Sequence, residues 1–364
     1  IKISRDADIY IEDEKAGNIL EKIRKKVKKR KIGALSRFMY DRAMPSDFLS
    51  FICDAFGIVP DDLVVGGRYL NLQDLNKLPN PRGKELESKP LLPMRIPYLD
   101  EIGSVIKAIK KQDVLLHFPY QSFDYLIRLL MEAAFDPKVD EIKITQYRVA
   151  ENSAVINTLI SAAQNGKKVT VFVELKARFD EENNMLTAEK MTQAGIRIIY
   201  SIPGLKVHAK IAIIIRKDTR EGLQRKHLAY LSTGNFNEKT AKIYSDIALL
   251  TAQTELVNDI NKVFAILEGR ICEATFSHLL VARFNMVPTL TEMIRREIQH
   301  VNEGRKGKII LKMNGLHDKN MINELYNASE QGVEIELIVR GICCLVPDQP
   351  YSRNIRITRI VDMF

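Results

Sequence analysis

Residues 141–175 read EIKITQYRVAENSAVINTLISAAQNGKKVTVFVEL, and much of this stretch returns at residues 308–339 as KIILKMNGLHDKNMINELYNASEQGVEIELIV. The two copies align without a gap at a constant offset of 166 positions. Each copy predicts a short apolar strand, a loop, a helix with apolar positions at helical spacing, a glycine turn and a second strand. Two strands joined through a helix in this way form a parallel crossover unit. The matched pairs are Ile144 and Ile310, Ile156 and Ile322, Asn157 and Asn323, Leu159 and Leu325, Ala162 and Ala328, Gly166 and Gly332, and Val173 and Val339.

The match resumes after a variable loop, where Ile196–Ile198 resembles Ile355–Ile357. In the first copy His208 follows Ile196 by twelve residues, and the same count from Ile355 falls about three residues beyond Phe364. The spacing predicts two similar lobes, the second of which is incomplete and lacks its histidine. We therefore expect the chain to be an internal piece of a longer protein.

The composition predicts a soluble globular protein with an anionic partner. The chain has 364 residues and a formal net charge of +9 at pH 7, with no apolar run of transmembrane length and no signal-like start. Charge alone does not choose between nucleic acid, acidic lipid and polyphosphate. The cysteines lack the spacing of a zinc site or a redox pair, which predicts a reducing, cytoplasmic location. They are Cys53, Cys272, Cys343 and Cys344.

Proline and charge patterns divide the chain. Ala16–Lys31 predicts a helix with a dense basic face, which is more typical of a solvated surface than of an anion site. Pro90, Pro93 and Pro97 mark a linker. We expect an α/β protein with part of an α+β head domain at residues 1–98, a first catalytic domain at 99–280 and the start of a second at 281–364.

Two neighbouring segments carry chemistry. Lys206–Ile215 reads as a strand, so that His208 and Lys210 project from one face and place a nucleophile beside a cation. The next strand leads into Ser232–Lys239, a turn in which Gly234 permits close backbone approach. Threonine and asparagine side chains of this turn can donate hydrogen bonds to phosphate oxygens. Together the segments predict a phosphate cradle beside an imidazole.

A His-x-Lys element followed by Gly/Ser-x-x-Asn resembles the phospholipase D superfamily, in which two lobes each supply such an element to one phosphoryl-transfer site. The usual aspartate after the lysine is missing, because Ile211–Ile215 is entirely apolar, and this argues against a standard phosphodiesterase. Over nearly the whole chain the motifs more closely resemble the middle of the bacterial polyphosphate kinase of the first type. The motifs are Ile144–Arg148, Gly166–Val169, Ala177–Glu182, Gly204–Lys210, Thr233–Ala241 and Val339–Gly341.

The resemblance implies two phospholipase D-like lobes and reversible transfer of the terminal phosphoryl group of ATP to inorganic polyphosphate, through a phosphohistidine at His208. A neutral imidazole suits this reaction because its phosphoramidate has a high transfer potential, so the transfer can run either way. Arg148 and Arg178 match positions that the family associates with magnesium and phosphate, which implies Mg²⁺ as cofactor. A guanidinium has no acceptor atom, so we interpret both as contacts to phosphate oxygens that the metal also touches, not as direct ligands.

The resemblance also implies nucleotide contacts in both copies. Tyr244 would lie against the adenine and Arg340 on a phosphate, with Lys210, Asn235 and Asn237 as further phosphate or ATP contacts. A core position for Tyr244 is the open alternative.

The chain departs from the family pattern in the strand before the turn. Many members carry a histidine where this chain has Tyr230, and His227, three residues earlier, would face the other way. We assign neither a catalytic role. His117, at a strand-to-loop exit, is expected near the site.

Two other functions stay open at this point: a phosphodiesterase or nuclease acting through the same histidine, and a polyanion-binding module without activity. The kinase interpretation implies ATP or ADP and inorganic polyphosphate as partners, no nucleic acid, and a homo-oligomer at full length. It also implies no transmembrane segment, with peripheral association at the inner membrane. Because phosphoryl transfer depends on positioning and charge stabilisation, we expect the chain by itself to make little or no polyphosphate.

Overall fold

The computed structural model describes residues 1–5, 35–150, 152–175, 181–200, 205–217 and 227–360. The chain divides into two compact units between Gln253 and Thr254, and each is described by itself. Among the described residues, no helix combines the length and the apolar character needed to cross a bilayer.

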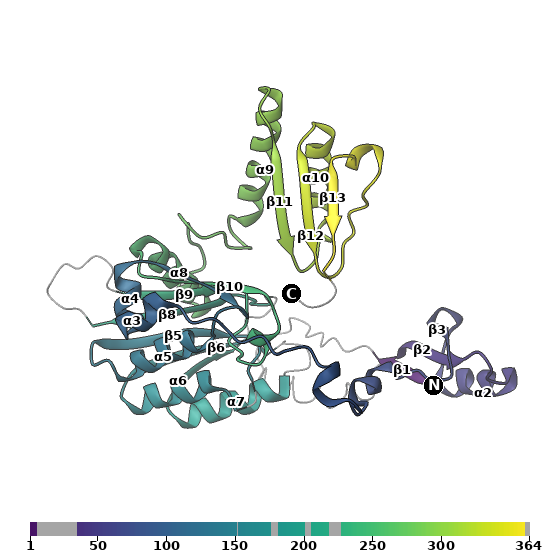
Figure 1. Ribbon diagram of the computed structural model, residues 1–364, viewed down its shortest axis with the longest axis horizontal. Coiled ribbons are helices and arrows are strands. Elements are labelled where there is room, and N and C mark those ends of the chain that lie inside the picture. The colour runs from purple at the N-terminus through teal and green to yellow at the C-terminus, as the bar shows by residue number, and fades with distance from the viewer. Residues whose placement is uncertain (6–34, 151, 176–180, 201–204, 218–226, 361–364) are drawn as a thin grey trace. The chain divides into compact units, whose positions relative to one another are not determined.

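The larger sheet of the first unit is mixed and has seven strands, most of which are labelled in Figure 1. Strands β5, β6 and β7 pair in parallel, and the other neighbours pair antiparallel. In spatial order the strands are β4 (Val114–Phe118), β10 (Asp246–Thr251), β9 (Leu228–Ser232), β8 (Lys210–Arg216), β5 (Val139–Gln146), β6 (Lys168–Val173) and β7 (Arg197–Tyr200). The predicted α/β class and the β5–α6–β6 crossover are confirmed.

The helix of the crossover forms where the sequence supplies a cap and an apolar face. The Ser153 side chain accepts a hydrogen bond from the Ile156 N–H, which satisfies one of the free donors at the N-terminus of α6 (Ala154–Gln164). Ile156 and Leu159 are buried on one face at helical spacing. Figure 1 shows α6 between α5 (Asp124–Phe135) and α7 (Glu181–Gln193) along the parallel strands.

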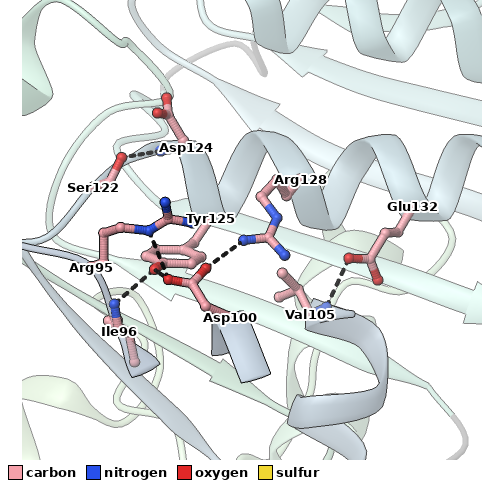
Figure 2. Close-up of polar contacts among 9 residues, drawn as sticks. All are labelled: Arg95, Ile96, Asp100, Val105, Ser122, Asp124, Tyr125, Arg128 and Glu132. Atoms are coloured by element: carbon pink, nitrogen blue, oxygen red, sulfur yellow. Dashed lines mark hydrogen bonds and ion pairs between the residues drawn. The ribbon is translucent and has the colours of Figure 1, made fainter. Parts of the chain in front are cut away.

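Two short helices are fastened to α5 by the polar contacts drawn in Figure 2. The Asp100 carboxylate, in α3 (Pro97–Ile102), accepts hydrogen bonds from Arg95 (2.8 Å), Arg128 (3.1 Å) and the Tyr125 hydroxyl (3.1 Å). The Tyr125 hydroxyl in turn accepts the Ile96 N–H at 2.7 Å. The hydrogen bond from Arg95 is the main cause that lowers the pKa of Asp100. The end of the proline-marked linker is therefore tied to α5.

Glu132 of α5 caps the next helix, α4 (Val105–Lys111). Its carboxylate accepts the N–H groups of Val105 (2.7 Å) and Ile106 (3.0 Å) and the Ser104 hydroxyl (2.7 Å). A carboxylate at a helix N-terminus satisfies free donors and interacts favourably with the helix dipole. This capping explains why so short a helix is well formed.

The second unit repeats the crossover. Its parallel sheet has the order β11 (Lys308–Met313), β12 (Glu334–Val339) and β13 (Ile355–Thr358). Figure 1 shows α9 (Met286–Asn302) and α10 (Lys319–Glu330) beside this sheet, and they bury one of its faces. The unit begins with α8 (Thr254–Leu267). The predicted duplication of β5–α6–β6–β7 as β11–α10–β12–β13 is confirmed.

The gap-free alignment of the copies is wrong by one residue in their first strand. Ile144 pairs with Val171, whose counterpart at the constant offset is Leu337. Leu337 pairs with Leu311, not with Ile310, which is 60% exposed. The second copy is therefore one residue shorter between its first strand and its helix.

A small mixed sheet lies near the N-terminus, with the order β1 (Lys2–Arg5), β2 (Leu35–Asp41) and β3 (Leu63–Gly66). With α2 (Ser46–Phe56) it encloses a core of Phe38, Ile52 and Ile58. The predicted basic helix Ala16–Lys31 lies outside the described residues, and the domain boundaries at residues 98 and 280 stay predictions. Short 3-10 helices are η1 (Pro60–Asp62), η2 (Leu72–Lys77), η3 (Gly83–Leu86), η4 (Thr240–Lys242) and η5 (Pro350–Ser352).

Candidate active site

His208 lies just before a strand and not within it. Strand β8 begins at Lys210, which pairs with Ser232, the last residue of β9. No ladder partner continues past Ser232 among the residues described, so the predicted strand start at Lys206 is wrong. His208 is exposed, whereas Lys210 is only 6% exposed and donates from Nζ to the His208 carbonyl at 2.5 Å. The two residues are therefore neighbours, but the His208 side chain is open to solvent and the Lys210 side chain is buried.

Side chains from two parallel strands hold the segment that carries His208. Thr145, near the end of β5, donates from its hydroxyl to the Ala209 carbonyl at 2.8 Å. Glu174 follows β6, is fully buried, and accepts the Val207 N–H at 2.8 Å. The backbone is therefore fixed on both sides of His208.

An aromatic ring at the carboxyl end of β5 contacts the imidazole. The rings of Tyr147 and His208 meet edge to face, with centroids 4.6 Å apart and planes at 82°. Lys210 Nζ lies 5.3 Å and Arg148 Cζ 5.7 Å from the centroid of the Tyr147 ring. Arg148 follows the end of β5, as predicted, and its charge also acts on His208.

The surroundings of His208 favour its neutral form. Partial loss of hydration is the first cause that lowers its pKa to about 4, and the charges of Lys210, Lys206 and Arg148 add to the effect. At neutral pH the ring is therefore uncharged and one of its nitrogens carries a free electron pair.

Lys210 has a lowered pKa of its own. Burial is the first cause and brings the value to about 8, Asp246 opposes the shift, and Arg148 contributes to it. Asp246 begins β10 and was not among the predicted site residues. The aspartate that usually follows the lysine of a His-x-Lys element is missing from this sequence, and Asp246 supplies a negative charge near Lys210 from another strand. The sequence offered one signal for Asp246: it is a charged residue at the start of an otherwise apolar strand.

Gly234 was expected to permit close approach of the backbone to phosphate. In the structure the group that lies close to it is the side chain of Asp246. The Asp246 carboxylate accepts from the Thr233 hydroxyl at 2.8 Å. A Cβ atom at Gly234 would lie 2.5 Å from Asp246 Oδ2, which is far inside van der Waals contact. Glycine is thus required to pack the turn against β10.

The two asparagines of the turn differ in their surroundings. Asn237 is buried, and its side-chain oxygen accepts the N–H groups of Lys239 (3.0 Å) and Thr240 (3.1 Å), which begins η4. This bonding uses the side-chain oxygen, and the structure gives no partner among the described residues for the amide N–H groups. Asn235 has a buried side-chain oxygen that finds no hydrogen-bond partner among the described residues.

Glu238 fastens the turn to the crossover helix. One carboxylate oxygen accepts from the Ser153 hydroxyl at 2.8 Å and from the Val155 N–H at 3.0 Å. The turn with Gly234 is therefore tied both to the N-terminus of α6 and to β10.

Tyr244 is 44% exposed, so the alternative of a core position is wrong. It lies between η4 and β10, next to Ser245. The Ser245 hydroxyl is 3.1 Å from His117 Nε2, and the His117 ring meets Tyr120 edge to face with centroids 4.8 Å apart. His117 thus lies beside the Tyr244 segment.

Tyr230 and His227 have structural positions. Tyr230 is 1% exposed and packs against Phe236 with ring centroids 5.2 Å apart. His227 accepts the Arg216 N–H at 3.0 Å through Nδ1. Both residues therefore have structural contacts, in keeping with the expectation that neither is catalytic.

The remaining predicted residues cannot be joined to this cluster. Arg178 lies outside the described residues. Arg340 belongs to the second unit, where it follows β12 and donates to the Asn314 side chain at 3.0 Å.

The described residues do not form a cage for a metal ion. Among them, no group of three or more histidine, cysteine, aspartate or glutamate side chains could hold one. The groups around His208 are mainly cationic. Ammonium and guanidinium groups have no lone pair to offer a metal ion, so these cations supply no ligand for Mg²⁺.

Three family models match the chain: the polyphosphate kinase middle domain at residues 1–78, C-terminal domain 1 at 104–273 and C-terminal domain 2 at 279–364. Polyphosphate kinases of Yersinia pestis and Escherichia coli K12 are 43% and 41% identical, and each match covers all of this chain and 53% of the relative. The chain thus spans about half the length of the curated relatives it matches. The crystal structure of polyphosphate kinase from Porphyromonas gingivalis is 54% identical, with a TM-score of 0.82 over 91% of this chain and 50% of that one.

Proposed function

This chain belongs to the polyphosphate kinase family, and on this premise we propose that the full-length protein transfers the terminal phosphoryl group of ATP reversibly to inorganic polyphosphate through a phosphohistidine at His208. The observation that supports the proposal is an imidazole that its surroundings keep neutral, beside Lys210 and Arg148. The turn that begins at Ser232, the strand partner of Lys210, has side chains that can donate hydrogen bonds to phosphate. Because all three matching models describe polyphosphate kinase, they favour this reaction over a phosphodiesterase or nuclease and over binding without activity.

In the first step the unprotonated ring nitrogen of His208 attacks the terminal phosphorus of ATP. The nitrogen–phosphorus bond forms as the bond from phosphorus to the bridging oxygen breaks, and ADP leaves with that electron pair. In the second step a terminal oxygen of polyphosphate attacks the same phosphorus and releases the imidazole. Each step exchanges one phosphoryl bond for another, so the sequence can run toward ATP when ADP and polyphosphate are abundant.

The cations beside His208 have two effects. They lower its pKa, which keeps the nucleophile neutral. They also offset the negative charge of the transferred phosphoryl group, and such fixed charges commonly supply much of the catalysis of phosphoryl transfer. With a pKa of about 8, Lys210 would be about 90% protonated at pH 7 and so available as one of these charges.

Mg²⁺ belongs to the proposal as a companion of the nucleotide. When bound, it would neutralise phosphate charge, and Arg148 would contact phosphate oxygens that the metal shares. Arg178 is proposed for the same role on the strength of the family resemblance.

The nucleotide contacts remain proposals. Tyr244 is exposed and can present its ring to the adenine. Asn235 and Asn237 belong to the turn beside His208, and their amide groups suit phosphate oxygens. Arg340 is proposed to bind phosphate from the second unit. Homo-oligomerisation, a cytoplasmic location and peripheral membrane association stay predictions.

Replacement of the nucleophile tests the proposal. In the full-length protein, His208→Ala should abolish both polyphosphate synthesis from ATP and ATP synthesis from ADP and polyphosphate. His278→Ala, at an exposed position of the second unit, is the matched control and should keep both activities. If His208→Ala retained either reaction, a phosphohistidine at this position would be refuted.

A further inference from the structure

The imidazole of His208 needs something other than a hydrogen bond to set its orientation. Within the part of the chain that the structure describes, no group hydrogen-bonds to the ring, although the His208 carbonyl accepts from Lys210 and the residues on both sides of His208 are held by hydrogen bonds. Attack on phosphorus requires the electron pair, which lies in the ring plane, to point along the line of the breaking bond. A ring that turns freely about its χ2 torsion would meet this condition only part of the time.

Tyr147 is the aromatic side chain placed to restrict that rotation. Its ring stands nearly perpendicular to the imidazole, at 82°, with the centroids 4.6 Å apart. This edge-to-face geometry is a favoured arrangement of aromatic pairs. Rotation of the imidazole out of its plane would break the arrangement, so the contact restricts the ring to that plane.

The backbone of Tyr147 is itself fixed. The Tyr147 carbonyl accepts a hydrogen bond from Asn184 Nδ2 at 2.9 Å, and the same side-chain amide donates to the Glu174 carbonyl at 3.1 Å. Asn184 is 1% exposed, so these bonds are protected from water. Glu174 in turn accepts the Val207 N–H next to His208. One buried network thus holds both partners of the ring pair.

We infer that Tyr147 is a positioning residue for the phosphoryl-accepting histidine. Its ring holds the His208 imidazole in the orientation for attack and does not need to touch the phosphate. The contact uses the face or edge of the aromatic ring, so the hydroxyl group is dispensable. This inference rests on the proposed phosphohistidine function and adds to it a residue that acts through the nucleophile.

Two substitutions in the full-length protein separate the ring from the hydroxyl. Tyr147→Leu removes the ring and should slow the single-turnover labelling of His208 by [γ-³²P]ATP on the order of tenfold, with the ATP dissociation constant unchanged. Tyr147→Phe keeps the ring and should restore the rate to within about twofold of the unsubstituted protein. A leucine variant as fast as the parent, or a phenylalanine variant as slow as the leucine variant, would overturn the inference.

A structural readout guards against a simple folding defect. The aromatic ring should shift the proton resonances of the His208 imidazole in NMR spectra of ¹³C-histidine-labelled protein. The shift should persist in Tyr147→Phe and disappear in Tyr147→Leu, while the other histidine signals stay in place. Absence of the shift in the parent protein would overturn the inference whatever the kinetics. Failure of the parent to be labelled at His208 would instead refute the proposed function, so the two failures are distinguishable.

Discussion

His208 should remain neutral across the physiological pH range, and this can be tested without measuring turnover. Loss of hydration and three nearby cations lower its pKa to about 4. Lowering the pH from 7.5 to 6 would then leave about 99% of the ring neutral, whereas a histidine with an ordinary pKa of about 6.5 would fall from about 90% to about 25% neutral. The two cases differ by roughly fourfold in the population of the nucleophile at pH 6.

The assay is an NMR titration of the ¹³C-labelled imidazole carbons in the full-length protein, from pH 8 downward. The His208 signal should hardly move above pH 5, while the same residue in denaturant should titrate near 6.5. Lys210→Met removes one cause of the shift, so the pKa of His208 should rise toward its ordinary value in that variant. A midpoint near 6.5 in the folded parent protein would refute the argument that these cations keep the nucleophile neutral.

Four further predictions concern the site and its support. Because the pKa of Lys210 is about 8, a pH–rate profile should show phosphoryl transfer falling about tenfold from pH 7 to pH 9, and Lys210→Arg should remove that fall. Gly234→Ala would place a Cβ atom 2.5 Å from Asp246 Oδ2, so kcat should fall on the order of a hundredfold; an unchanged kcat would contradict the tight packing. Tyr125→Phe leaves the Ile96 N–H without its acceptor and should lower the free energy of unfolding by about 1–3 kcal/mol in urea titrations, a loss that intact stability would disprove. The 364-residue chain by itself should make little or no polyphosphate from ATP, and robust synthesis would show that the rest of the full-length protein is dispensable.

The crossover could be predicted because periodicity and turn residues are local signals. The apolar residues at helical spacing indicated α6, and Gly166 marked the turn into β6, where it adopts a φ of 76°. The register of the second copy could not be predicted in the same way. Ile309, Ile310 and Leu311 are all apolar, so a shift of one residue leaves the sequence pattern intact. Only the pairing and the exposure of Ile310 reveal it.

The site could be predicted only in part. The spacing of His208 and Lys210 indicated a nucleophile beside a cation, because both lie in one short segment. The contacts that orient them come from β5, β6 and β10, which are far away in the sequence. The only sequence signal for Asp246 was therefore a polar residue at the start of an apolar strand, and Glu174 carried no comparable signal. The start of β8 at Lys210 depended on where β9 ends.

The phosphohistidine mechanism is tested most directly by locating the transferred phosphate. Full-length protein mixed briefly with ATP, quenched at alkaline pH to preserve phosphoramidates and digested, can be examined by tandem mass spectrometry. We expect phosphate on the peptide containing His208, and its loss when ADP or polyphosphate is added before the quench. Polyphosphate synthesis without phosphate on His208, or with phosphate on another residue instead, would contradict it.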